Sequence, residues 1–122
     1  MEELSFSFGD SPEMADELLA LVLEGRKRAT AWAAVKGTQG VEVGSRSIVK
    51  DGQGRPRAVI ETIELTRRRF ADVDHSFAHD EGEGDLSLDY WREAHRSYFT
   101  REGTYADNME VYCERFRLLK TL

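Results

Sequence analysis

Residues 46–65 read RSIVKDGQGRPRAVIETIEL, and this stretch decides the fold class. Two runs rich in β-branched residues flank the turn signal DGQG at 51–54. Such a signal between two strand-like runs is typical of a β-hairpin. The sequence therefore predicts that residues 46–50 and 56–65 pair as antiparallel strands in the middle of the chain.

The return strand of this hairpin also carries a burial pattern. Side chains alternate between the two faces of a strand, so Val59, Ile63 and Leu65 are expected to share the inward face. Glu61 interrupts that face. A carboxylate among inward-facing apolar residues lies either at a rim or in a pocket, and the rim is the commoner place.

Upstream of the hairpin, the sequence predicts a strand, a helix and a second strand. Residues 4–8 alternate apolar and polar side chains, which is typical of a short strand. Ser11 is expected to cap a helix that has Pro12 at its first position. A glycine can adopt the left-handed conformation that ends a helix, so this helix is expected to end near Gly25. Residues 30–35 are predicted to form a short strand.

Downstream of the hairpin, the sequence predicts a second long helix and a closing strand. Residues 70–79 are expected to form a loop with a short helical turn. Ser87 is expected to start a helix that ends at Gly103. Residues 109–119 carry apolar side chains on both faces, as expected of a strand inside a sheet.

The order of these elements is strand, helix, strand, hairpin, helix, strand. Because strands and helices do not alternate strictly, the order favours the α+β class over a doubly wound parallel sheet. We expect a mainly antiparallel, curled sheet that forms a small, partly closed barrel with two main helices. Residues 1–122 are expected to form a single domain.

Composition narrows the function classes. The net charge of −6 argues against a bulk, non-specific binder of nucleic acids. No apolar run is long enough to span a membrane, and the acidic N-terminus has no apolar targeting core. The single cysteine, Cys113, suits a reducing compartment and is expected to be a buried packing residue. We therefore expect a cytoplasmic protein without a membrane partner.

The strongest candidate site starts at Gly25, with the residues Arg26, Lys27, Arg28, Ala29 and Thr30. These residues leave the first helix in a bend that concentrates three cations and a hydroxyl. An acidic, glycine-rich run, EGEGD, follows about fifty residues later at 81–85. A basic cleft on an acidic body would bind a phosphate-bearing ligand, although arginines on strands are as often solvated edges.

In this order, the motifs resemble the ASCH domain family, a relative of the PUA RNA-binding β-barrel. Residues 25–30 are similar to the family's G-x-K-x-x-T signature. Val43-Gly44 is similar to its hydrophobic-G-D strand entry, although Ser45 stands where an Asp is usual. Residues 78–91 are similar to the A-x-x-E-G-E-G-D-x-S-L-x-x-W run of one bacterial subgroup, and 114–116 to its closing strand.

The resemblance implies a PUA-like barrel with a cleft beside the first helix that binds single-stranded RNA or a nucleoside. It also implies hydrolase activity, with cleavage of single-stranded RNA placed first. The alternative activity is hydrolysis of the amide of N4-acetylcytidine. The family's catalytic residues would fall on Lys27, Thr30 and Glu81, with Glu83 as the competing acid. A third alternative is a non-catalytic RNA-binding module.

Amide hydrolysis sets physical conditions on these residues. The Thr30 hydroxyl needs a neighbour that takes its proton. Lys27 can do so only when neutral, so its pKa must be lowered by burial or by cations such as Arg26 and Arg28. On a straight strand Lys27 and Thr30 would face opposite ways, so they converge only if the chain bends after Gly25.

The ribonuclease hypothesis gives the same residues other tasks. Lys27 would stay charged and stabilise the developing charge on phosphorus. The flanking arginines would hold neighbouring phosphates. Trp32, or Tyr98 and Tyr105, could stack an unpaired base. No cofactor is firmly implied, although Glu81 with its neighbour Glu83 could hold a divalent metal in this case.

Several residues also have a purely structural interpretation. Lys27 could be a solvated loop charge and Thr30 an ordinary strand residue. On the second long helix, Trp91 is expected in the core and His95 is expected to be a satisfied interior or rim histidine. A metal site at His75, His79 and Glu83 is disfavoured, because the glycines at 82 and 84 interrupt a continuous helix.

Overall fold

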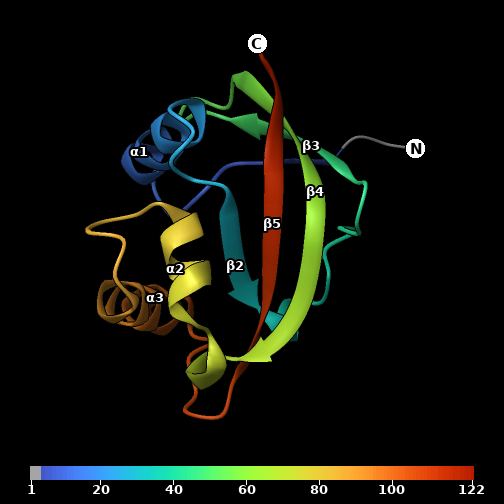
Figure 1. Cartoon of the computed structure of the whole chain (residues 1–122). Helices are drawn as coiled ribbons and strands as arrows, with labels where there is room; N and C mark the ends of the chain where they lie inside the picture. The colour runs from blue at the N-terminus through green and yellow to red at the C-terminus, as the bar shows by residue number, and fades with distance from the viewer. Residues whose placement is uncertain (1–3) are drawn as a thin grey trace.

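The computed structural model describes residues 4–122 (Figure 1). Five strands and three α-helices follow one another within this range, together with two short 3₁₀ turns at 34–36 and 70–72. The strands are β1 (Leu4–Phe6), β2 (Ala29–Ala33), β3 (Arg46–Lys50), β4 (Pro56–Arg69) and β5 (Glu110–Thr121). The helices are α1 (Pro12–Leu23), α2 (His75–Glu81) and α3 (Leu88–Glu102).

The strands form one sheet in the order β1-β3-β4-β5-β2. Only β1 and β3 are parallel, and the other three pairings are antiparallel. The two longest strands, β4 and β5, curve together along one side of the molecule, and the three helices lie on the other side (Figure 1). The prediction of an α+β fold with a mainly antiparallel, curled sheet is therefore confirmed. The sheet stays open, because β1 and β2 are its two edges.

The predicted inward face of β4 is wrong. Ile63 is 51% exposed, and the buried positions of the strand are Ala58, Ile60 and Thr62. The register of β4 against β5 shifts between Val59 and Ile60, and again between Thr62 and Glu64. The buried positions still alternate strictly from Ala58 to Thr62, so the prediction was wrong because it chose the opposite face of the strand as the inward one. Glu61 lies on the other face from the buried positions, where its carboxylate accepts a hydrogen bond from Arg117 at 2.8 Å.

The helix boundaries agree with the predicted caps. The Ser11 hydroxyl accepts a hydrogen bond from the backbone N–H of Met14, and Ser87 caps α3 in the same way. Gly25 follows α1 with a φ of 83°, and Gly103 ends α3 with a φ of 84°. The short helix α2 is more regular than the predicted turn, with Asp74 as its cap.

Two apolar clusters hold these layers together, and β5 contributes to both. Val111 and Cys113 face a cluster formed with α2 and α3, whereas Phe116 packs in a second cluster with α1. Apolar side chains on both faces are what the sequence predicted for a strand inside the sheet. Cys113 is buried as expected, and burial raises the pKa of its thiol to about 12. Across residues 4–122, the structure contains no helix that is both long and apolar enough to cross a membrane.

Candidate functional site

A cavity of about 340 Å³ lies where the sheet stays open. Both edge strands line it: residues 4–6 from β1 and residues 30–32 from β2. Helix α3 adds His95 and Tyr98, and Lys27 and Glu81 line the same space. The cavity is therefore built from segments far apart in the sequence, and it contains the chain's strongest sequence motifs.

Lys27 enters this cavity because α1 ends where it does. After the left-handed Gly25, the backbone N–H groups of Arg26 and Lys27 both donate to the carbonyl of Leu21. The bend turns the Lys27 side chain inward, where the residue is only 2% exposed. The interpretation of Lys27 as a solvated loop charge is therefore wrong. The predicted bend after Gly25 is present, and it brings Lys27 and Thr30 to the same cavity.

The ammonium of Lys27 makes hydrogen bonds to two carbonyls and two carboxylates. It donates to the carbonyl of Ala29 at 2.8 Å and, at 3.4 Å, to that of Glu81. It also donates to Glu81 Oε1 at 3.2 Å and to Glu83 Oε2 at 2.8 Å. Burial alone would lower the pKa of Lys27, but the two carboxylates outweigh burial and raise it. The lowered pKa that amide hydrolysis with Lys27 as the base would require is therefore not found, and Lys27 is an ammonium in this arrangement, as the ribonuclease hypothesis expected.

Close backbone packing places the glutamates beside Lys27. Helix α2 ends at Gly82, which has a φ of 72°. A Cβ atom at Gly82 would lie 2.2 Å from the carbonyl oxygen of Arg26, so only glycine fits this contact. The backbone N–H of Arg28 donates to the carbonyl of Asp80 at 2.7 Å. The basic motif and the glycine-rich acidic run therefore dock directly on each other.

Helix α3 supplies the other partners of Glu81. The indole N–H of Trp91 donates to Glu81 Oε2, and His95 Nε2 lies 3.0 Å from the same oxygen. Burial would raise the pKa of Glu81, but His95, Lys27 and the Trp91 hydrogen bond lower it to about 2. Glu81 is thus a fully buried carboxylate with donors at both oxygens.

His95 is the site residue that the sequence missed. Trp91 was expected in the core and is buried there, and His95 was expected to be an interior or rim histidine without a role. Their spacing of four residues on one helix was visible in the sequence. The sequence did not show that the last turn of α2 packs against the side of α3 that carries Trp91 and His95.

Glu83 is more exposed than Glu81 and makes fewer hydrogen bonds. Its side chain is 14% exposed. Within residues 4–122, only one of its carboxylate oxygens, Oε2, accepts a hydrogen bond, and the donor is Lys27. Glu83 itself lines the cavity. Of the two competing acids, Glu83 has an oxygen free to receive a proton, whereas Glu81 is held on both sides.

Thr30 and Trp32 line the cavity from β2. Neighbouring Lys27 does not bond to the Thr30 hydroxyl, which makes no hydrogen bond to any residue in the described range 4–122. The indole N–H of Trp32 donates to the carbonyl of Gly37 at 2.8 Å, which fixes the ring. A hydroxyl and an aromatic ring are thus presented to a ligand.

Three predicted binding residues are not among the residues that line the cavity. The exposed Arg26 donates to the carbonyl of Gly84 at 3.3 Å. Arg28 pairs with Asp80 at 3.0 Å. The Tyr105 ring packs edge-on against Phe70 in the core, and its hydroxyl donates to an aspartate two residues on. These three side chains do not reach the cavity because each is bonded to a group outside it.

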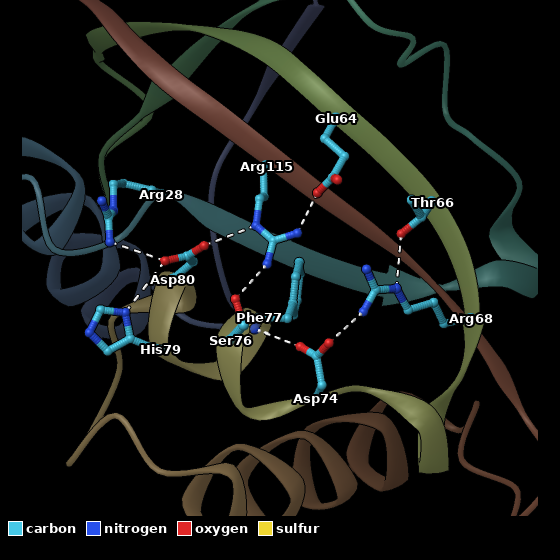
Figure 2. Close-up of polar contacts among 10 residues, drawn as sticks. All are labelled: Arg28, Glu64, Thr66, Arg68, Asp74, Ser76, Phe77, His79, Asp80 and Arg115. Carbon is cyan, nitrogen blue, oxygen red and sulfur yellow. Dashed lines mark hydrogen bonds and ion pairs between the residues drawn. The ribbon is translucent and has the colours of Figure 1, made fainter.

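Figure 2 shows where Arg28 goes. It joins a polar network that links α2 to β4 and β5, in which Asp80 accepts hydrogen bonds from both Arg28 and Arg115. Arg115 also pairs with Glu64, and a second pair links Arg68 to Asp74. Other members of the basic clusters are paired in the same local way: Arg67 with Glu110, Arg69 with Asp72 and Arg117 with Glu61.

The cluster Glu81, Glu83 and His95 places three potential metal-ligand atoms within 4.8 Å of one another. The ammonium of Lys27 already bonds to both carboxylates. A divalent cation that used the bonded oxygens of these carboxylates would have to compete with that ammonium. Lys27 thus already supplies a cation to these carboxylates, and we assign no metal to the cluster. The alternative set suggested by spacing is not assembled, because His75 and His79 are exposed on α2.

With this geometry in view, comparison with known proteins identifies the family. The family model of the ASCH domain matches residues 4–120. The chain belongs to the ASCH domain family. The structure of an ASCH domain from Lactobacillus crispatus is 30% identical to it, with a TM-score of 0.86 over 96% of this chain and 79% of that one. A protein from Enterococcus faecalis is 32% identical, with a TM-score of 0.86 over 99% of this chain and 78% of that one.

A more distant ASCH protein shows the fold alone. The structure from Zymomonas mobilis is 7% identical to this ASCH domain, with a TM-score of 0.61 over 98% of this chain and 70% of that one. No curated protein matches the chain.

Proposed function

We propose that this ASCH domain binds an acylated nucleobase or nucleoside in its cavity and hydrolyses the amide. The observation that carries the proposal is the buried Lys27 ammonium, held by Glu81 and Glu83 in the same cavity as the unbonded Thr30 hydroxyl. ASCH domains are generally linked to RNA binding, which supports a nucleobase as the ligand.

The size and walls of the cavity support a small ligand. A volume of about 340 Å³ is at the lower end of the range of small-molecule sites. Aromatic side chains of Phe6, Trp32 and Tyr98 line it. Such rings can stack on a base, as in the recognition of unpaired nucleotides.

The charges of the cavity support an uncharged ligand. Among its lining residues, the basic side chains are Lys27, Lys36 and His95, and His95 is held by Glu81. Lys27 is paired with two carboxylates, and Lys36 with Glu102 at 2.6 Å. A phosphate would meet no unpaired cation on these walls. For this reason we place amide hydrolysis ahead of RNA cleavage. RNA cleavage stays a prediction from the sequence.

The proposed chemistry follows from which groups have room to act. The Thr30 hydroxyl attacks the acyl carbon, and the oxygen on which negative charge develops takes the place of one of the present acceptors of the Lys27 ammonium, whose three hydrogens are all engaged before the reaction. The free oxygen of Glu83 accepts the hydroxyl proton and returns it to the leaving amine. Water then hydrolyses the ester on Thr30. In this scheme Lys27 is a donor, and Glu83 takes the basic role that the sequence gave to Lys27.

A turnover assay with variants at Thr30 tests the proposal. Purified protein is given N4-acetylcytidine and, separately, a labelled single-stranded RNA. We expect deacetylation by the wild type, retention of part of it in Thr30→Ser, and a loss on the order of 10³-fold in Thr30→Ala. Thr38→Ala, at an exposed threonine that does not line the cavity, is the matched control.

Two results would contradict the assignment. The first is deacetylation that survives unchanged in Thr30→Ala, which would remove Thr30 as the nucleophile. The second is RNA cleavage by the wild type that Thr30→Ala or a Lys27 variant abolishes, with no deacetylation. That outcome would put the ribonuclease hypothesis first.

A further inference from the structure

We propose that His95 is a positioning residue of this site, which, protonated on both ring nitrogens, holds Glu81 in the orientation that keeps the Lys27 ammonium in the cavity. His95 acts through Glu81, so it needs no contact with the substrate. The inference rests on the proposed function for its effect on turnover, but its structural part can be measured without any substrate.

The hydrogen bonds of the ring fix its protons. His95 Nδ1 lies 2.9 Å from the carbonyl oxygen of Trp91, and Nε2 lies 3.0 Å from Glu81 Oε2. A carbonyl can only accept a hydrogen bond, and so can an ionised carboxylate. Both nitrogens must therefore carry hydrogen while Glu81 is ionised. A neutral imidazole would set a lone pair against one of these oxygens.

Packing prevents the ring from leaving this arrangement. The ring stacks on Trp91 with centroids 4.1 Å apart and an interplanar angle of 17°. The ring of Phe99 meets it edge-on from the next turn of α3, at 5.9 Å. Because these contacts hold the ring on two sides, Glu81 receives a donor in a fixed direction.

The charges around His95 are consistent with an imidazolium. Glu81 and Glu83 face it from the end of α2, and Lys27 lies beyond them from the bend before β2. With His95 charged, two cations oppose two carboxylates in the buried cluster. Burial would lower the pKa of His95, but Glu81 outweighs it and raises the pKa. The proton is therefore retained to a higher pH than in an ordinary histidine and lost as the pH rises through that raised value.

NMR of the ring nitrogens tests the protonation directly. In the ¹⁵N-labelled wild type at neutral pH, we expect both His95 nitrogens to be protonated, with a pKa above the ordinary value for histidine. The variant His95→Gln assigns the signals. Glu81→Gln should lower the His95 pKa, because it removes the carboxylate charge. A neutral His95 with one protonated nitrogen in the wild type at neutral pH would overturn the proposal.

Turnover of N4-acetylcytidine tests the positioning role. We expect His95→Gln, which keeps a donor, to lower kcat about tenfold with little change in KM, and His95→Leu to lower it about a hundredfold. The alkaline fall of kcat/KM that accompanies loss of the His95 proton should disappear in His95→Gln. His75→Gln, at an exposed histidine on α2, is the matched control.

The two measurements separate this inference from the proposed function. Wild-type protein that does not turn over the nucleoside contradicts the proposed function, and the NMR result then decides the arrangement of His95 alone. Wild-type turnover with an unchanged kcat and pH profile in His95→Gln overturns the positioning role, whatever the NMR shows.

Discussion

Lys27 is the residue on which the candidate site depends. A fully buried ammonium is tolerated only because Glu81 and Glu83 compensate its charge. The positions of Lys27, Thr30 and Glu81 could be anticipated from the ordered motifs. Their protonation could not, because the pKa of Lys27 depends on which of its neighbours point inward. Arg26 and Arg28 flank it in sequence but are bonded elsewhere.

Removing the buried Lys27 charge should lower the stability of the fold more than removing an exposed charge. We expect Lys27→Met to lower the free energy of unfolding by about 3–5 kcal/mol, because two carboxylates lose their cation in a buried place. Lys36→Met is the matched control. It breaks the more exposed pair with Glu102, so its cost should be at most about 1 kcal/mol. Urea unfolding of both variants measures the difference, and equal costs would contradict the compensation argument.

Glu114 gives a pH-dependent prediction on the neighbouring strand. Its buried carboxylate accepts a hydrogen bond from the Thr62 hydroxyl at 2.6 Å, and burial raises its pKa. A carboxyl whose pKa is higher in the folded state stabilises the fold below its unfolded pKa, and this contribution is lost as the pH rises through the folded value. We therefore expect Glu114→Gln to raise the melting temperature at neutral pH and to have little effect near pH 4, by scanning calorimetry at both pH values. A stabilisation that is the same at both would contradict the raised pKa.

At the scale of elements, the caps and turns were predictable and the inward face of β4 was not. Ser11, Ser87 and Gly103 mark helix ends through local chemistry, which the sequence carries directly. The buried residues of β4 alternate as in any strand, at Ala58, Ile60 and Thr62. Alternation along one strand shows which side chains share a face but not which face the rest of the fold covers, so the sequence of β4 alone placed Ile63 on the wrong side.

The docking of α2 on the bend before β2 makes a testable prediction at this scale. Gly82→Ala should destabilise the protein strongly, because the new Cβ would meet the backbone of Arg26 and one of the two segments would have to move. Gly103→Ala is the control, because its φ of 84° is similar and nothing lies near the added atom. In that variant the free energy of unfolding should fall only by roughly 1–2 kcal/mol, the cost of holding an alanine in the left-handed conformation. Thermal unfolding distinguishes them, and comparable losses would mean that the close approach is unimportant.

At the scale of the whole molecule, charge is balanced locally around an acidic average. The net charge is −6, yet the arginine clusters of β4 and β5 pair with neighbouring carboxylates. In the cavity between the sheet edges, Lys27 and Lys36 are likewise paired with glutamates. The proposed binding of a nucleoside in this cavity should therefore not depend on phosphate contacts.

Salt dependence tests this view of the molecule. Binding that releases counterions from phosphates weakens by orders of magnitude between about 50 and 200 mM salt. We expect the affinity of the Thr30→Ala variant for N4-acetylcytidine, measured by calorimetry, to change less than about twofold over that range. Cytidine, the deacetylated product, offered to the wild type is the matched probe. A steep loss of affinity for either nucleoside would mean that unpaired charge governs the cavity. A single-stranded RNA that binds tightly at low salt and is released at high salt, in competition with the nucleoside, would mean that the same cavity receives a base from a longer strand.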